Sequence, residues 1–259
     1  MKTILLFFCM AVSAKAGAQS DGQDPDLHLY LLIGQSNMAG RGPLDEAGKK
    51  EDPRILMLDS LDQWVVATDP VHFDKPKMAG VGPGRAFAAG MLKTGKKVRI
   101  GLIPCAWGGS PIRVWQPDAR YFKARPYDDA LRRARIAMQK GVLKGVLWHQ
   151  GESDNDTVHA AVYMARLEEL VARLRTDLKD PHLPFVAGEI GYFNKKGTLI
   201  NTIIDQLPQQ VPGTAVVSAK GLMHKGDSVH FDTPSARELG RRYAAAMKQL
   251  QDSAGRGAE

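Results

Sequence analysis

Cysteine is almost absent from this chain, which has two among its 259 residues. Cys9 lies in an apolar N-terminal segment that we expect to be removed. Cys105 is then the only thiol of the mature protein, and an intramolecular disulfide is excluded. The N-terminal segment is itself too short to anchor the chain in a bilayer. We therefore predict a protein held together by core packing, with no membrane span.

The first eighteen residues have the outline of a secretory signal peptide. Lys2 precedes an apolar segment at residues 4–12, which small residues follow, among them Ala16 and Ala18. Cleavage after either alanine would give a secreted or periplasmic protein. The remaining residues, 19–259, contain no low-complexity linker and are numerous enough for one sizeable core. We predict a signal peptide at residues 1–18 and a single domain after it.

Strong charge of one sign is also missing. The formal net charge is +7, and Lys2 and Lys15 in the predicted signal account for two of these charges. A small basic excess would suit an acidic polysaccharide or a nucleic acid. However, the basic residues are dispersed, and the densest groups, at residues 132–135 and 241–242, are typical of solvated helix faces. We predict no nucleic-acid partner.

Apolar runs alternate with amphipathic segments along the chain. The expected strands are residues 29–33, 54–58, 98–103, 145–148, 185–190 and 214–218, and the expected helices are residues 84–92, 128–140, 157–178, 198–207 and 233–250. The first strand lacks polar alternation, as expected of a strand buried on both faces. Residues 59–84 are expected to form a long loop. Repeated strand-helix units predict an α/β fold with a mostly parallel sheet and helices on both faces.

Three predicted strands end on polar turns that contain glycine. The turns are GQSNM from Gly34, CAWGGS from Cys105 and HQGESD from His149; a fourth motif, DSVHFD from Asp227, precedes the last helix. Ligands bind at the carboxyl ends of strands in open α/β folds, so we expect these turns to form one site. Each turn alone also has an ordinary structural interpretation, such as a helix cap or a tight turn.

Ser36, His230 and Asp227 together meet the needs of nucleophilic catalysis. A serine hydroxyl attacks only when a base takes its proton, and a carboxylate holds that base in the required tautomer. Asp227 and His230 are three residues apart and can contact each other on one loop. Glu152 is the alternative carboxylate, or else it braces the turn that carries it.

Acyl transfer also needs donors for a developing oxyanion. The candidates are the Ser36 N–H, a backbone N–H from Gly108 or Gly109, and the side-chain amide of Gln150. Four further residues near these turns are candidate substrate contacts: Asn37, Trp107, Trp115 and His149. The two tryptophans are equally well explained as partly buried packing residues.

In combination, the four motifs resemble the SGNH (GDSL-like) hydrolases, in the branch of sialate O-acetylesterases and carbohydrate esterase family 6 acetylxylan esterases. The resemblance covers nearly the whole mature chain. It implies a three-layer, flavodoxin-like α/β/α fold and removal of O-acetyl groups from sugars without a metal or another cofactor. The expected substrate is acetylxylan-type carbohydrate, with an O-acetylated sialic acid as the alternative.

Position by position, the resemblance assigns roles to the same residues. It makes Ser36 the nucleophile, His230 the base and Asp227 its partner. It also makes the turn of Gly108 and Gly109, with Gln150, the oxyanion hole. One departure is that Gln150 replaces the asparagine usual in the wider superfamily, and its amide is one methylene longer.

Three other interpretations are weaker. A metal site could use side chains that are common ligands, namely His149, Glu152, Asp227 and His230, but the helical His-x-x-x-His spacing is missing. A non-catalytic carbohydrate-binding protein could use Trp107 and Trp115 as stacking platforms. A lipase-type nucleophile elbow needs Gly-x-Ser-x-Gly, and the chain has Met38 where the second glycine belongs.

Overall fold

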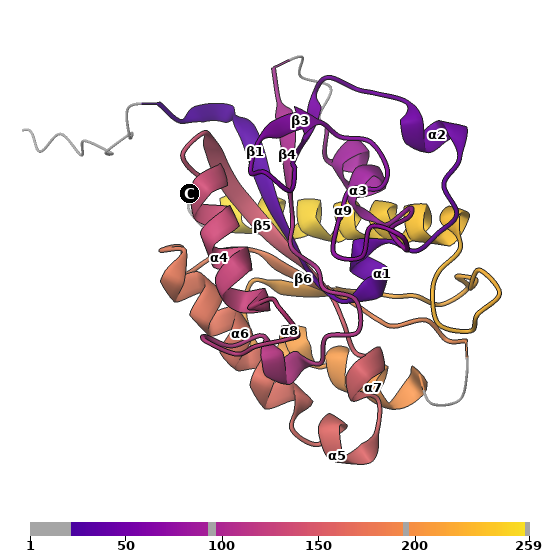
Figure 1. The fold of residues 1–259 in the computed structure, drawn as a ribbon. Coiled ribbons are helices and arrows are strands. Elements are labelled where there is room, and N and C mark those ends of the chain that lie inside the picture. The colour runs from indigo at the N-terminus through magenta and orange to yellow at the C-terminus, as the bar shows by residue number, and fades with distance from the viewer. Residues whose placement is uncertain (1–21, 93–96, 194–196, 257–259) are drawn as a thin grey trace, which may run out of the picture.

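The computed structural model describes residues 22–92, 97–193 and 197–256, through which one seven-stranded sheet runs in the order β3-β2-β4-β1-β5-β6-β7 (Figure 1). The strands are β1 (Asp24–Gly34), β2 (Ile55–Leu58), β3 (Trp64–Val66), β4 (Arg99–Pro104), β5 (Gly141–His149), β6 (Phe185–Gly188) and β7 (Thr214–Val217). All neighbours pair in parallel except β2 and β3. The predicted signal peptide, residues 1–18, lies outside the described residues.

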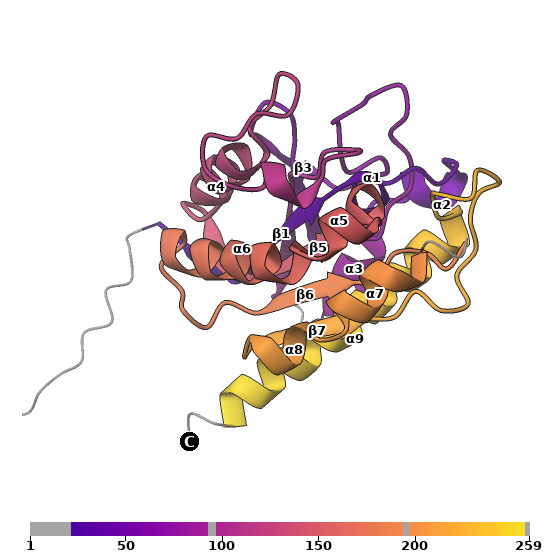
Figure 2. The same ribbon diagram turned by 90° about the horizontal axis from the view of Figure 1, so that it is seen from below.

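Helices cover both faces of this sheet. Helices α3 (Gly84–Met91) and α9 (Thr233–Arg256) lie on one face, and α4 (Pro126–Ala137) and α6 (Tyr163–Asp177) on the other (Figure 2). Shorter helices are α1 (Ser36–Ala39), α2 (Glu46–Lys49), α5 (Thr157–Ala160), α7 (Gly197–Ile204) and α8 (Leu207–Gln210), with 3-10 turns η1 (Ile112–Val114) and η2 (Glu152–Asp154). The predicted α/β/α sandwich is confirmed. Among the described residues, no helix is both long and apolar enough to cross a bilayer.

The central strand β1 is buried on both faces. Leu29 and Leu31 contribute to the core beneath α4 and α6, whereas Tyr30 and Leu32 contribute to the core beneath α3 and α9. Successive side chains of a strand point to opposite faces, so both sets must be apolar when both faces are covered. This explains the unbroken apolar run that predicted the strand.

Two predicted elements differ from the structure. The region 59–84, expected to be a loop, contains β3, a three-residue edge strand whose side chains are partly exposed. Such a strand carries too little apolar pattern to be recognised from sequence. The helix expected at residues 157–178 is divided into α5 and α6, because Asp156 caps a separate first helix and Val162 is exposed with a non-helical backbone.

The ends of β1 and β5 approach each other very closely at Gly34. Its φ is +124°, and a Cβ placed there would lie 2.1 Å from the carbonyl oxygen of His149. Glycine is therefore required both by the backbone conformation and by the neighbouring strand. This close approach places the turn after β1 beside the turn after β5.

We predict that Gly34→Ala lowers the free energy of unfolding by about 3 kcal/mol, because it adds a steric clash to the cost of a positive φ. The matched control is Gly221→Ala, whose φ is +77° and whose added Cβ meets nothing within 4 Å. The control should cost about 1 kcal/mol, the strain alone. Urea unfolding of both variants measures the difference; equal losses would contradict the steric explanation.

Candidate active site

Ser36 lies at the carboxyl edge of the sheet, as the first residue of α1 directly after β1. It is 6% exposed, and its Oγ is 3.0 Å from Nε2 of His230. His230 comes from the loop between β7 and α9, 194 residues along the chain. The fold thus brings together the serine and the histidine that sequence reasoning paired.

Asp227 holds the other side of the His230 ring. Its Oδ2 is 2.7 Å from Nδ1 of His230, and its Oδ1 accepts the backbone N–H groups of Val229 at 3.0 Å and His230 at 2.8 Å. Partial burial raises the pKa of Asp227, but the hydrogen bonds from His230 and Val229 outweigh it and hold this pKa well below its usual value. An ionised Asp227 favours a proton on Nδ1, which leaves Nε2 to accept one from Ser36.

Glu152, the alternative carboxylate, contacts Asn37 instead. Its Oε1 accepts a hydrogen bond of 2.5 Å from Nδ2 of Asn37. Burial raises the pKa of Glu152 to about 6, against the opposing effect of the Asn37 hydrogen bond. Of the two carboxylates considered from the sequence, Asp227 is therefore the one hydrogen-bonded to His230, while Glu152 braces the turn after β1.

Asn37 connects this brace to the histidine loop. Besides Glu152, its Nδ2 donates to the carbonyl oxygen of Val229 at 3.0 Å, and its Oδ1 accepts the N–H of Phe231 at 3.1 Å. The side chain is 3% exposed and its hydrogen bonds are spent within the protein. This corrects the prediction of Asn37 as a substrate contact, because it positions the residues on either side of His230.

Gln150 was predicted to direct its side-chain amide into the site, but the amide points into the protein interior. Its side chain is fully buried, and its amide nitrogen donates to Asp154 Oδ2 at 2.6 Å, Gln35 Oε1 at 3.1 Å and the Ser110 carbonyl at 3.2 Å. Both amide hydrogens are therefore engaged inside the protein. The expectation of a Gln150 oxyanion donor is corrected: the longer side chain reaches a buried carboxylate and supports Gln35, the neighbour of Ser36.

In the glycine turn after β4, only one of the two glycines has a backbone N–H that is free to stabilise an oxyanion. The Gly108 N–H donates to Oδ2 of Asp74 at 2.8 Å, and Asp74 forms a buried ion pair with Arg41 at 2.7 Å. Gly109 is exposed with φ +84°. Within the described part of the chain, the N–H groups of Ser36 and Gly109 have no hydrogen-bond partner, so these two can face a developing oxyanion.

Two predicted substrate contacts are core residues. Trp115 is buried, donates from Nε1 to Ser110 Oγ at 3.0 Å and packs edge-on against Trp148. His149 is also buried, with Nδ1 3.1 Å from the Tyr243 hydroxyl, and burial lowers its pKa to about 3. Both predictions are corrected, because these side chains point into the core. Trp107 stays partly exposed on the glycine turn.

Sequence reasoning missed the Arg41–Asp74 pair, which shapes the glycine turn. Both side chains are about 1% exposed, and Asp74 comes from the loop before α3. A buried pair of this kind is stable only with good geometry and additional hydrogen bonds, which the Gly108 N–H and the Gly40 carbonyl supply. The two residues are 33 positions apart in sequence, with no spacing that signals their contact.

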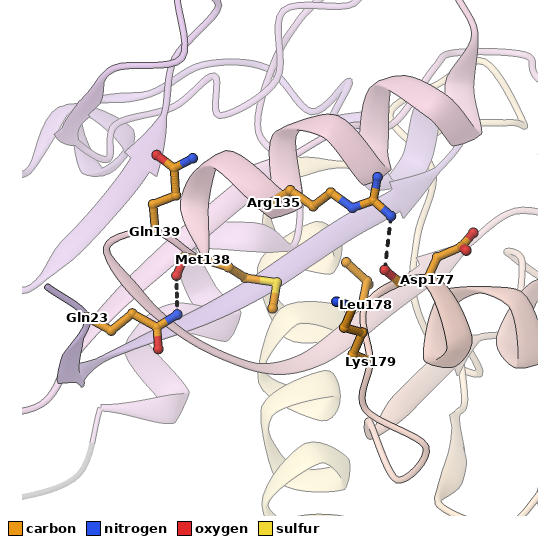
Figure 3. A pocket seen from close by; sticks show the side chains of 7 residues that line it. All are labelled: Gln23, Arg135, Met138, Gln139, Asp177, Leu178 and Lys179. Atoms are coloured by element: carbon orange, nitrogen blue, oxygen red, sulfur yellow. Dashed lines mark hydrogen bonds between the residues drawn. The ribbon is translucent and has the colours of Figure 1, made fainter. Parts of the chain in front are cut away.

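Two surface cavities lie at different distances from Ser36. A cavity of 490 Å³ lies beside Gln23, where β1 begins, and is lined by the ends of α4 and α6 (Figure 3). It is therefore at the opposite end of β1 from Ser36. A smaller one, of 210 Å³, is lined by Trp107 and Phe73 beside the glycine turn. Within the described residues, no group of three or more His, Cys, Asp or Glu is arranged to hold a metal ion.

Comparison with known proteins identifies the family of this chain. A family model described as carbohydrate esterase, sialic acid-specific acetylesterase, matches residues 26–249. The chain is 34% identical over 243 residues to "Probable carbohydrate esterase At4g34215" of Arabidopsis thaliana, covering 86% of this chain and 90% of that protein. The crystal structure of the Arabidopsis protein matches with a TM-score of 0.77 and 32% identity, over 87% of this chain and 99% of that one.

Two more distant structures share the fold. NanS matches with a TM-score of 0.71 at 19% identity, over 88% of this chain and 99% of its own. XAC1771, a carbohydrate acetylesterase from Xanthomonas citri, matches with a TM-score of 0.66 at 19% identity, over 87% of this chain and 56% of its own.

The sheet order and the two helical layers define a three-layer α/β/α fold, which the chain shares with NanS. The chain belongs to the carbohydrate esterase, sialic acid-specific acetylesterase family, and it is an esterase. The family resemblance of the four sequence motifs is thereby confirmed.

Glu152 should make stability depend on pH. Its pKa is about 6 in the folded chain against an ordinary 4.5, so its contribution is fully present below 4.5 and is lost as the pH rises through 6. Glu152→Gln keeps an oxygen for Asn37 and removes the titration. Its unfolding free energy relative to wild type should rise by about 2 kcal/mol between about pH 4 and about pH 7.5. Parallel pH profiles in urea unfolding would contradict a buried Glu152 carboxyl.

Proposed function

We propose that this esterase is a serine carbohydrate O-acetylesterase that passes through an acetyl-Ser36 intermediate. The observation that carries the proposal is the line of contacts from Ser36 Oγ to His230 Nε2, 3.0 Å, and from His230 Nδ1 to Asp227 Oδ2, 2.7 Å. These are the distances that general-base activation of a serine requires.

In the proposed reaction, His230 Nε2 takes the proton of Ser36 as Oγ attacks the carbonyl carbon of the acetyl ester. The N–H groups of Ser36 and Gly109 stabilise the oxyanion, and Asp227 stabilises the imidazolium. The imidazolium then gives its proton to the departing sugar oxygen, which leaves acetyl-Ser36. A water molecule, deprotonated by His230, attacks this ester; acetate departs and Ser36 regains its proton.

The proposed substrate is an O-acetylated polysaccharide or oligosaccharide of the acetylxylan type, with O-acetyl sialic acid as the alternative. Membership of a carbohydrate esterase family supports a sugar ester, and the family description favours the sialic acid alternative. Acetate release measured in parallel on acetylated xylan, acetylated xylo-oligosaccharides and O-acetyl sialic acid decides between them.

Export is part of the proposal and rests on the signal-like pattern of residues 1–18. It places the enzyme outside the cytoplasm, where polymeric sugars are accessible. N-terminal sequencing of the protein recovered from its natural compartment tests this: a start near residue 17 or 19 supports export, and an intact Met1 contradicts it.

Ser36→Ala should retain the fold and lose acetate release. The substitution removes one oxygen from a small side chain, so the melting temperature should hardly change. We expect kcat on an aryl acetate to fall by about 10⁴-fold or more, because no acetyl-enzyme can form. Activity near the wild-type value in folded Ser36→Ala protein would end the serine mechanism.

Asp227→Ala and Glu152→Ala should differ in kcat. Loss of the carboxylate that contacts the His230 ring should lower kcat by about a thousandfold. Glu152→Ala should have a much smaller effect, because Asn37 keeps its bonds to Val229 and Phe231. Steady-state kinetics on one aryl acetate, at matched folded protein, compares the two variants; a larger loss for Glu152→Ala would reverse the assignment.

A further inference from the structure

Two aromatic residues, the partly buried Tyr121 and the strongly exposed Phe122, lie on the loop between η1 and α4. Tyr121 and Ala124 exchange backbone hydrogen bonds of 2.9 and 3.0 Å, which leaves Phe122 at the tip of a tight turn. Phe122 is 83% exposed and its φ is +52°, and its ring packs edge-on against Tyr121 at 4.7 Å. A bulky residue at positive φ is uncommon, and backbone strain of this kind gathers at functional sites.

This aromatic turn, Tyr121 and Phe122, adjoins the glycine turn of the active site. The Tyr121 hydroxyl donates to the carbonyl oxygen of Gly108 at 3.4 Å. A Cβ placed on Gly109 would lie 2.9 Å from the same hydroxyl. The aromatic surface therefore starts at the backbone that faces the oxyanion and extends outward from it through Phe122.

The segment that runs from the glycine turn to the start of α4 is basic. Residues 107–125 contain four basic residues and one acidic residue. Asp118 is paired with Arg125 at 3.2 Å. The other three basic residues are exposed and have no ion-pair partner among the described residues: Arg113, Arg120 and Lys123. Burial raises the pKa of the Tyr121 phenol and so does the charge of Asp74, whereas the charge of Arg113 lowers it.

We propose that the aromatic turn is a subsite for an acidic sugar of the acetylated substrate. The C–H face of a pyranose ring packs on the exposed Phe122 ring, and the carboxylate of the sugar pairs with the free basic groups beside it. The subsite rests on the proposed function, since it lies next to the Gly109 donor of that reaction. It makes the enzyme select carboxylate-bearing O-acetylated saccharides, such as uronate-substituted oligosaccharides, over neutral ones.

The test uses Phe122→Ala, which keeps a Cβ and hence the same backbone demand, with Leu61→Ala as the matched control. Leu61 is 77% exposed and lies in the turn between β2 and β3. The substrates are acetylated xylo-oligosaccharides of one length with and without a glucuronate substituent, O-acetyl sialic acid, and an aryl acetate. A third variant, Arg120→Gln/Lys123→Gln, removes two of the free charges.

For Phe122→Ala we expect KM on the glucuronate-bearing oligosaccharide to rise about tenfold, with kcat and the aryl acetate kinetics unchanged. The single variant Phe122→Trp should keep the wild-type KM, because it retains an aromatic ring. The KM of Leu61→Ala should also equal that of wild type. The double variant should reduce by about threefold the preference for the acidic over the neutral oligosaccharide, with less effect in high salt. If the changes occur with O-acetyl sialic acid instead, the acidic sugar is a sialic acid and the subsite stands.

Unchanged KM on every acidic sugar in Phe122→Ala would overturn the subsite, as would equal losses on the aryl acetate. If the double variant keeps the wild-type preference for the acidic oligosaccharide, the proposed pairing of the sugar carboxylate with Arg120 and Lys123 is overturned. These outcomes are distinct from failure of the proposed function, in which the wild-type enzyme itself releases no acetate from any of the sugars.

Discussion

The hydrogen bonds of the Asn37 carboxamide hold the serine turn and the histidine loop of this site together. The carboxamide binds the Glu152 carboxylate after β5 and the backbone on both sides of His230. Asn37 itself follows Ser36 in the first turn of α1. One side chain thus joins the ends of two central strands to a loop that arrives from the far end of the chain. These bonds fix the separation of Ser36 and His230 together with Phe231, the neighbour of His230, whose side chain is buried in the core.

Buried polar groups support the turns from below. Gln150 links Gln35 to Asp154, and the Arg41–Asp74 pair holds the Gly108 N–H. Buried polar groups cost free energy unless they are hydrogen-bonded, so each such network allows few alternative arrangements. Hydrogen bonds therefore hold the inner side of these turns, and the groups left for the proposed reaction are the Ser36 hydroxyl, the His230 ring and the N–H groups of Ser36 and Gly109.

Much of the architecture was predictable because local pattern and fold rules agree. The apolar run at residues 29–33 predicted a strand covered on both faces, and parallel strands place their terminal turns at one edge. The mutual contact of Ser36, Asp227 and His230 was predictable from the four motifs in combination, whereas their catalytic roles stay a prediction. The edge strand β3 was not, because three half-exposed residues show no periodicity.

The direction of a polar side chain at a strand end was the hardest property to predict. Gln150, Asn37 and His149 all lie at the predicted edge, yet each side chain turns inward to satisfy a buried partner. Sequence position locates the turn but not the neighbour with which the side chain pairs. The Arg41–Asp74 pair and the aromatic turn went unpredicted for the same reason, since their significance lies in what the fold places beside them.

The most direct test of the central claim is the site of covalent labelling by a serine-directed organophosphate. We expect one adduct per chain, located on Ser36 by mass spectrometry of the digested protein, with acetate release lost in proportion to the labelled fraction. In the proposed mechanism His230 deprotonates Ser36, so His230→Ala protein should label far more slowly. An adduct on another residue, or full activity in protein labelled completely at Ser36, would contradict the account.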